Sequence, residues 1–189
     1  MHKLPLNEAH LWYVLSDNRT LESRHDMFLD MCDEDEKKRF ERYHFDKDKW
    51  LYLLTRGLIR TTLSKYLGGP PKRWRFQQNE YGKPYLAMPQ EPVGSICFNL
   101  TNTRGLVAVL IARNVEVGID AEYSSREVDV LGLSTRFFSP IEQKELKQHP
   151  VSNQERRFLD YWTLKESFIK AKGMGLSIPL DKFSIILNK

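Results

Sequence analysis

The sequence of 189 residues is poor in cysteine and lacks any long apolar segment. Its two cysteines, Cys32 and Cys97, are too few for a disulfide framework and show no metal-binding spacing with a histidine. The longest apolar run, Leu106 to Ala112, is too short to cross a membrane, and the first residues lack the apolar stretch of a signal peptide. We therefore expect a soluble, cytoplasmic protein that does not bind membranes and keeps its cysteines as thiols.

Long repeats and low-complexity segments are also missing, which excludes repeat and fibrous architectures. Hydrophobic residues make up 41% of the chain and aromatic residues 12%, enough for a sizeable core. The length suits one domain, or two small halves that share a core.

Positive charge is in excess and unevenly distributed. The formal net charge is +4, and the stretch from Lys37 to Arg75 holds twelve Lys or Arg against three acidic residues. Such a patch attracts phosphates, nucleic acid or an acidic protein. It is equally the composition of a solvated face on a long helix, so both interpretations stay open.

The N-terminal residues alternate between helix and strand patterns. Asp33 and Glu36 form a capping box for a helix to about Arg42, and Asp46 to Leu67 is expected as a long helix that ends at Gly68. A further helix is expected over 21–31, and strands over 11–15, 74–76, 83–86 and 96–100. Polar residues 101–105 follow, so we expect domains at 1–104 and 105–189.

The C-terminal residues show the same two kinds of pattern. Strands are expected at 106–112, at its hairpin partner 115–122, and at 183–187. Ser139 to Glu142 predicts a helix start, and a second helix, capped by Ser152 and Glu155, is expected to stop at Gly173. Each half thus combines strands with a long helix, which indicates an α+β protein with a duplicated layout.

Acidic side chains on two of these elements suggest chemistry. Glu166 and Lys170 lie one turn apart beside Trp162, which is also the spacing of an ordinary exposed helix salt bridge. Asp120 and Glu122 leave the same face of the predicted strand, as a metal site would require or as an exposed strand end would allow. Three converging carboxylates would favour magnesium and a phosphate substrate.

Five phrases resemble, in order and spacing, the 4'-phosphopantetheinyl transferases of the surfactin-synthetase-activating type. The most specific are G-x-D-x-E and W-x-x-K-E-x-x-x-K-A-x-G, and the resemblance covers residues 74–176 and, more loosely, the helices before them. The phrases are Trp74-Arg75-Phe76, Gly82-Lys83-Pro84, Phe98-Asn99-Leu100-Thr101, Gly118-Ile119-Asp120-Ala121-Glu122 and Trp162 to Leu176.

The resemblance implies two similar α+β halves in one monomeric chain, with coenzyme A in the cleft between them. It implies transfer of 4'-phosphopantetheine from coenzyme A to a serine of an acidic apo acyl, polyketide or peptidyl carrier protein. The reaction releases adenosine 3',5'-bisphosphate and depends on magnesium, with manganese as the alternative ion.

The resemblance also implies roles for individual residues. Asp120, Glu122 and Glu166 match the metal ligands, Glu166 matches the general base, and Lys170 matches the lysine at the transferred phosphate. The coenzyme A contacts match Lys83, Pro84, Thr101, Asn102, Lys165 and Lys170.

Three departures from the family pattern are visible. Asn102 stands where many members have histidine, and Leu51 where many have a basic residue, for which Lys47 or Lys49 would substitute. The segment after the last helix is shorter than in many members, which would affect carrier docking.

Two other classes of function compete with the transferase. One is a non-catalytic domain of the same fold that binds a carrier protein or a nucleotide, against which the complete carboxylate trio argues. The other is a nucleic-acid-binding module, for which no recognised motif is present, so we expect no nucleic acid as partner.

Overall fold

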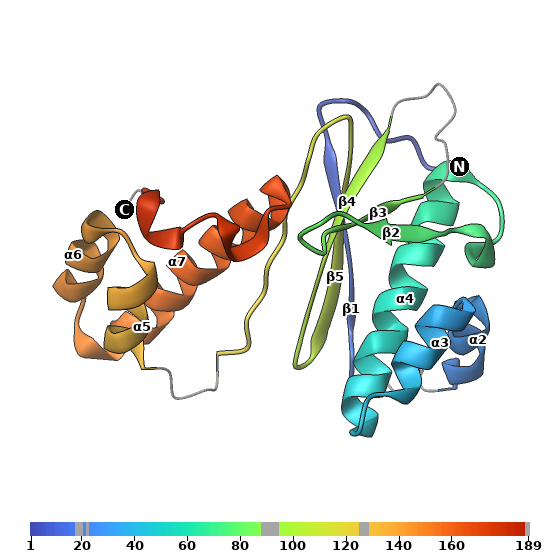
Figure 1. Ribbon diagram of the computed structural model, residues 1–189, viewed down its shortest axis with the longest axis horizontal. Coiled ribbons are helices and arrows are strands. Elements are labelled where there is room, and N and C mark those ends of the chain that lie inside the picture. The colour runs from blue at the N-terminus through green and yellow to red at the C-terminus, as the bar shows by residue number, and fades with distance from the viewer. Residues whose placement is uncertain (18–20, 22, 88–94, 125–128, 188–189) are drawn as a thin grey trace.

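The computed structural model of the protein describes residues 1–17, 21, 23–87, 95–124 and 129–187. The fold is a mixed α+β arrangement in which a sheet and a long helix form the N-terminal part, and helices form the C-terminal part (Figure 1). An extended stretch over residues 114–123 leads from one part to the other. No helix of the described residues is both long and apolar enough to cross a membrane.

The main sheet has three antiparallel strands in the order β1-β5-β4. The central strand β5 (Leu106–Arg113) is the apolar run identified in the sequence, and its neighbours are β1 (Ala9–Leu15) and β4 (Ile96–Thr103). The division expected at residue 104 falls in the turn of the β4–β5 hairpin, where Thr103 pairs with Leu106. A second, two-stranded sheet pairs β2 (Phe76–Gln78) with β3 (Pro84–Leu86).

Helix α4 (Asp46–Leu67) covers one face of the main sheet and has the bounds that the sequence predicts. Its apolar side buries Ile59 and Leu63 in one core with Val109 and Ile111 of β5. Helices α2 (His25–Met31) and α3 (Glu34–Glu41) pack against the N-terminal half and middle of α4 (Figure 1). The expected capping box of α3 is confirmed, because Asp33 and Glu36 exchange side-chain to backbone hydrogen bonds.

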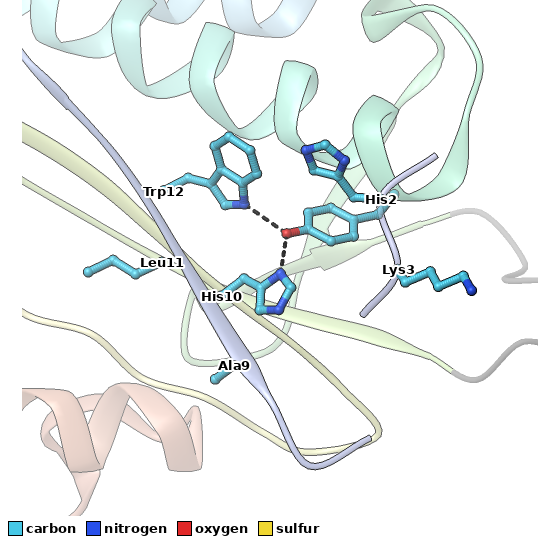
Figure 2. A pocket seen from close by; sticks show the side chains of 7 residues that line it. His2, Lys3, Ala9, His10, Leu11 and Trp12 are labelled. Carbon is cyan, nitrogen blue, oxygen red and sulfur yellow. Dashed lines mark hydrogen bonds between the residues drawn. The ribbon is translucent and has the colours of Figure 1, made fainter. Parts of the chain in front are cut away.

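At its other end, α4 is tied to β1 by polar aromatic contacts. The Tyr66 hydroxyl lies 2.9 Å from the indole Nε1 of Trp12, which donates to it, and 2.6 Å from the imidazole Nδ1 of His10. Figure 2 shows Trp12 and His10 in the pocket that they line. The His2 ring stacks on Trp12 with ring centroids 5.6 Å apart. The pocket beside these groups is lined by none of the candidate functional residues, so we interpret its hydrogen bonds as structural.

The C-terminal part contains α5 (Val130–Phe137), α6 (Pro140–Gln148) and α7 (Val151–Lys172), followed by the 3-10 turns η2 (Gly175–Ser177) and η3 (Leu180–Lys182). Helix α5 was not expected from the sequence. The capping box at Ser139 is confirmed, whereas the one expected at Ser152 is wrong, because α7 begins one residue earlier without a side-chain cap.

The strands expected at 115–122 and 183–187 are also wrong, since the described residues of both segments are not strands. Side chains take up backbone groups that a sheet would have paired. The Asn99 amide oxygen accepts from the Ile119 N–H at 3.0 Å, and the Glu142 carboxylate accepts from the Ile185 N–H at 2.8 Å. The described C-terminal residues therefore provide helices alone, and the duplicated layout is not confirmed.

A buried ion pair joins the C-terminal elements. Lys165 of α7 and Glu142 of α6 are both 0% exposed, and the ammonium nitrogen lies 2.8 Å from the carboxylate. The same nitrogen donates to the carbonyl oxygens of Leu180 and Phe183, each at 2.7 Å. The pair thus fixes both α6 and the last described segment against α7.

Lys165→Met is expected to destabilise the protein by about 3–5 kcal/mol, because it leaves the Glu142 carboxylate buried without a counter-charge. Thermal unfolding measures this loss against Lys144→Met, which removes an exposed lysine from α6. Adding Glu142→Leu to Lys165→Met should recover part of the stability. A Tm equal to that of Lys144→Met would contradict the buried pair.

Glu145 and Arg157 form a second link between α6 and α7. The guanidinium Nε lies 3.0 and 3.2 Å from the two carboxylate oxygens. Hydrogen bonds from Arg157, followed by that from His149, lower the pKa of Glu145 to about 2, although its partial burial acts in the opposite direction. The ionised carboxylate is therefore favoured in the folded state.

The stabilising effect of Glu145 should depend on pH. It is complete above the ordinary glutamate pKa of about 4.3 and is lost as the pH falls toward about 2. Unfolding experiments should show that Glu145→Gln lowers the stability at pH 7 and that the difference from wild type shrinks below about pH 4. An equal difference at both pH values would show that the charge of Glu145 does not matter.

Candidate active site

The extended stretch over 114–123 is pressed against α7 at Gly118. A Cβ atom on this glycine would lie 1.9 Å from the carbonyl oxygen of Ser167 and 2.5 Å from the amide nitrogen of Ala171. Real Cβ atoms do not approach backbone atoms this closely, so the position requires glycine. Asn99 of β4 holds the next residue through the hydrogen bond to the Ile119 N–H.

This placement brings Asp120 to Lys170 on α7. The ammonium nitrogen of Lys170 donates to Asp120 Oδ1 at 3.2 Å, and Thr101 Oγ1 lies 3.4 Å from the same oxygen. The second carboxylate oxygen, Asp120 Oδ2, is buried and has no hydrogen-bond partner among the described residues. A buried carboxylate oxygen without a partner is costly, so this atom is a candidate for binding a ligand or a cation.

Glu166 lies one helical turn before Lys170, and the charges of Asp120 and Glu122 in the neighbouring stretch act on its carboxyl group. Burial raises the pKa of Glu166 above its ordinary value, and the charges of Asp120 and, to a lesser degree, Glu122 raise it further. Lys170 acts in the opposite direction. The ion pair described for Lys170 is with Asp120, which does not support the interpretation of Glu166 and Lys170 as a simple exposed helix pair.

Glu122 is exposed and lines a pocket of about 1,090 Å³ between the start of α4 and the β4–β5 turn. Lys47, Trp50, Arg104 and Tyr123 line the same pocket, and the Arg104 guanidinium lies 4.9 Å from the centre of the Tyr123 ring. Within the described part of the chain, no three His, Cys, Asp or Glu side chains are grouped closely enough to hold a metal ion. The convergence of all three carboxylates on one metal therefore stays a prediction.

The predicted coenzyme contacts fall in separate places. Thr101 is buried beside Asp120, whereas Asn102 is exposed and its amide donates to Thr55 Oγ1 on α4 at 3.2 Å. Lys83 lies at the C-terminal end of α7, where its ammonium pairs with Glu116. Pro84 begins β3 directly after it.

Lys165 does not join these residues, which corrects its prediction as a coenzyme contact. Its ammonium is fully buried and is held by Glu142 and two carbonyl oxygens, so it cannot reach a ligand in this arrangement. Sequence reasoning missed Asn99 as a positioning residue. The signal was available, because Asn99 is a polar residue between Phe98 and Leu100 in a strand that is otherwise mostly buried.

Comparisons with known proteins identify the family of the chain. Residues 19–114 match the family model described as 4'-phosphopantetheinyl transferase, N-terminal, and residues 116–189 match that of the 4'-phosphopantetheinyl transferase superfamily. The two matches meet about ten residues after the division expected at 104, at the start of the stretch that carries Asp120.

Individual relatives match nearly the whole chain. The 4'-phosphopantetheinyl transferase HetI of a Nostoc species is 32% identical over 96% of this chain and 75% of its own length. A 4'-phosphopantetheinyl transferase of Bacillus subtilis is 32% identical over 94% of this chain and 76% of its own length. The Sfp enzyme of Bacillus subtilis strain 168 is 28% identical over 95% and 77%. The chain therefore belongs to the 4'-phosphopantetheinyl transferase superfamily and is of the Sfp-like type.

Proposed function

We propose that the protein transfers 4'-phosphopantetheine from coenzyme A to a serine of an apo carrier protein and releases adenosine 3',5'-bisphosphate. The observation that carries this proposal is the ion pair of Lys170 with Asp120, one helical turn from Glu166, where the stretch over 114–123 packs against α7. These side chains come from the two most specific family phrases. Their charges suit a reaction at phosphorus, which needs positioning and charge stabilisation more than a nucleophile on the enzyme.

The carboxylates fit a hard cation. Asp120 Oδ2 is buried without a partner among the described residues, and Asp120 lies in the electrostatic range of Glu166. A cation would give the unsatisfied Asp120 oxygen a partner and would reduce the repulsion between the Asp120 and Glu166 carboxylates. Magnesium or manganese would take these oxygen ligands. Asp120 and Glu166 would hold the ion, with Glu122 assigned to it by the resemblance alone, and the bound ion would neutralise charge on the phosphates.

The remaining steps can be assigned to side chains of this chain. Glu166 accepts the proton of the carrier serine hydroxyl, directly or through one water. The serine oxygen then forms a bond to the phosphorus of the phosphopantetheine group. The bond from that phosphorus to the departing adenosine 3',5'-bisphosphate breaks, and the departing group keeps the electron pair on its phosphate oxygen. Lys170 stabilises the negative charge that develops on the transferred phosphate.

Coenzyme A would bind in the pocket beside Glu122, which suits it by size and whose lining mixes two cationic residues with the acidic Asp17, Asp48 and Glu122. The pocket volume of about 1,090 Å³ slightly exceeds the usual range of about 300–1,000 Å³ for small-molecule sites, which suits a large nucleotide. Lys47 and Arg104 offer cations for phosphates, and Leu51 lines the wall beside Lys47. We propose that Lys47 substitutes for the basic residue that many relatives have at the position of Leu51. Thr101 and Asn102 of β4 are also proposed as coenzyme contacts. They and Pro84 are assigned to the coenzyme by the resemblance alone.

The carrier protein is proposed to be acidic. Lys38, Arg39, Arg42 and Lys47 are exposed on α3, α4 and the loop between them, where basic side chains alternate with exposed acidic ones, and these cations would meet an acidic partner. By contrast, Arg60 from the same basic stretch is buried and pairs with Glu36. The monomeric state and the cytoplasmic location remain expectations of the sequence.

Intact mass measurement of apo carrier proteins, incubated with the protein, coenzyme A and magnesium, tests the proposal. We expect a gain of one phosphopantetheine group, lost when magnesium is removed with a chelator. Glu166→Gln keeps the side-chain shape but removes the base and a charged ligand, so it should slow the transfer about a hundredfold or more without lowering the Tm. Glu41→Gln, which changes an exposed glutamate on α3, should leave the rate unchanged.

Two results would contradict the proposal. If several acyl and peptidyl carrier proteins are tested, and a carrier binds the wild-type protein but none gains mass, a non-catalytic domain would be favoured. A Glu166→Gln protein as active as wild type would return Glu166 to the role of an ordinary helix residue.

A further inference from the structure

The turn between β2 and β3 lies against the C-terminal end of α7, the helix that carries Glu166 and Lys170. The Asn79 side-chain amide donates to the Gly173 carbonyl oxygen at 2.6 Å. The Lys83 ammonium donates to the Ala171 carbonyl oxygen at 2.8 Å. These contacts join residues that are about ninety positions apart in the sequence.

The Ala171 carbonyl is one of the last four of α7, which have no partner within the helix, and Gly173 directly follows the helix. A positive charge at this end also interacts favourably with the helix dipole. Asn79 and Lys83 therefore act as a C-terminal cap for α7 that is supplied from the other part of the chain.

The cap is preformed and closely fitted. Asn79 Oδ1 accepts from the backbone N–H groups of Tyr81 and Lys83 at 3.0 and 2.9 Å, which fixes the turn. Gly173 has a left-handed φ of 69°, and a Cβ on it would lie 2.8 Å from Lys83 Cδ and 3.2 Å from Asn79 Nδ2. A larger residue at 173 would separate the turn from the helix.

Lys83 also holds the stretch that leads to Asp120. Its ammonium forms an ion pair with Glu116 and lies 3.5 Å from the Val117 carbonyl oxygen. A single side chain thus contacts the end of α7 and the residues just before Gly118. These are the two segments that bring Lys170 and Asp120 together.

We propose that Asn79 and Lys83 are positioning residues, which cap α7 and fix Lys170 relative to Asp120 for phosphoryl transfer. The proposal rests on the proposed function. It also differs from the role that the resemblance implies for Lys83, a contact to the nucleotide. The side chain of Lys83 is only 13% exposed and its ammonium already has protein acceptors, which leaves little capacity for a ligand.

The kinetic constants of Asn79→Ala and Lys83→Met distinguish the two roles. Lys83→Met keeps most of the aliphatic stem and removes the charge. If both residues position α7, each variant should lower kcat about tenfold or more, and KM for coenzyme A should change less than about threefold, because misplacement of catalytic groups slows the chemical step. Lys83→Arg, which keeps a positive charge and donors, should restore much of the rate.

Lys72→Met is the matched control, because it removes an exposed lysine from the same part of the chain and should leave both constants unchanged. The proposal is wrong if Lys83→Met raises KM for coenzyme A at unchanged kcat while Asn79→Ala behaves like wild type. That pattern would make Lys83 a nucleotide contact.

Hydrogen exchange of backbone amides tests the cap without relying on activity. Asn79→Ala should increase the exchange of α7 peptides covering residues 167–173, with the remainder of the fold protected as in wild type and in Lys72→Met. Unchanged exchange would overturn the cap even if the enzyme is active. If Asn79→Ala increases the exchange but the wild-type protein transfers no phosphopantetheine, the cap is supported and the proposed function is refuted.

Discussion

The contact between the backbone of Gly118 and the backbone of α7 is the constraint on which the candidate site depends. Asp120 is two residues further along an extended chain, so its distance from Lys170 is set by how closely Gly118 approaches the helix. An added Cβ would meet the Ser167 carbonyl oxygen at 1.9 Å, and this contact could be relieved only by moving the whole stretch. The glycine of the G-x-D-x-E phrase is therefore explained by packing, whereas its carboxylates are explained by chemistry.

The N-terminal sheet acts as the support for this contact. Asn99 of β4 is buried at 3% exposure and holds the Ile119 N–H, and Thr101 two residues later faces Asp120. Strand β4 pairs along its length with β5, and β5 packs on α4. The main core of the protein therefore fixes the position of Asp120. The site is thus shared between residues of both parts of the chain.

Two lysines of α7 show how position decides the role of the same side chain. Lys165 points toward α6, is fully buried and neutralises Glu142, so its contribution is to stability. Lys170 lies on another side of the helix, is partly exposed and faces Asp120, so its charge is available to a phosphate. Sequence position alone could not separate them, because both belong to one family phrase and only the neighbouring elements differ.

The sequence predicted local structure where the signals are local. The capping boxes at Asp33 and Ser139 and the bounds of α4 depend on residues within a few positions, and all are confirmed. The strand patterns at 115–122 and 183–187 misled, because side chains of Asn99 and Glu142 bind backbone groups there, and those partners are distant in sequence. The family resemblance assigned Asp120 and Lys170 to one site, whereas their direct ion pair and the supports at Asn99 and Gly118 required coordinates.

The rate of phosphopantetheine transfer by Gly118→Ala tests this account most directly, with circular dichroism of the same sample to establish that the helices are formed. The account predicts that one methyl group displaces the stretch bearing Asp120 and lowers the rate about a hundredfold or more, at unchanged helix content. A folded Gly118→Ala protein that transfers phosphopantetheine at the wild-type rate would contradict it.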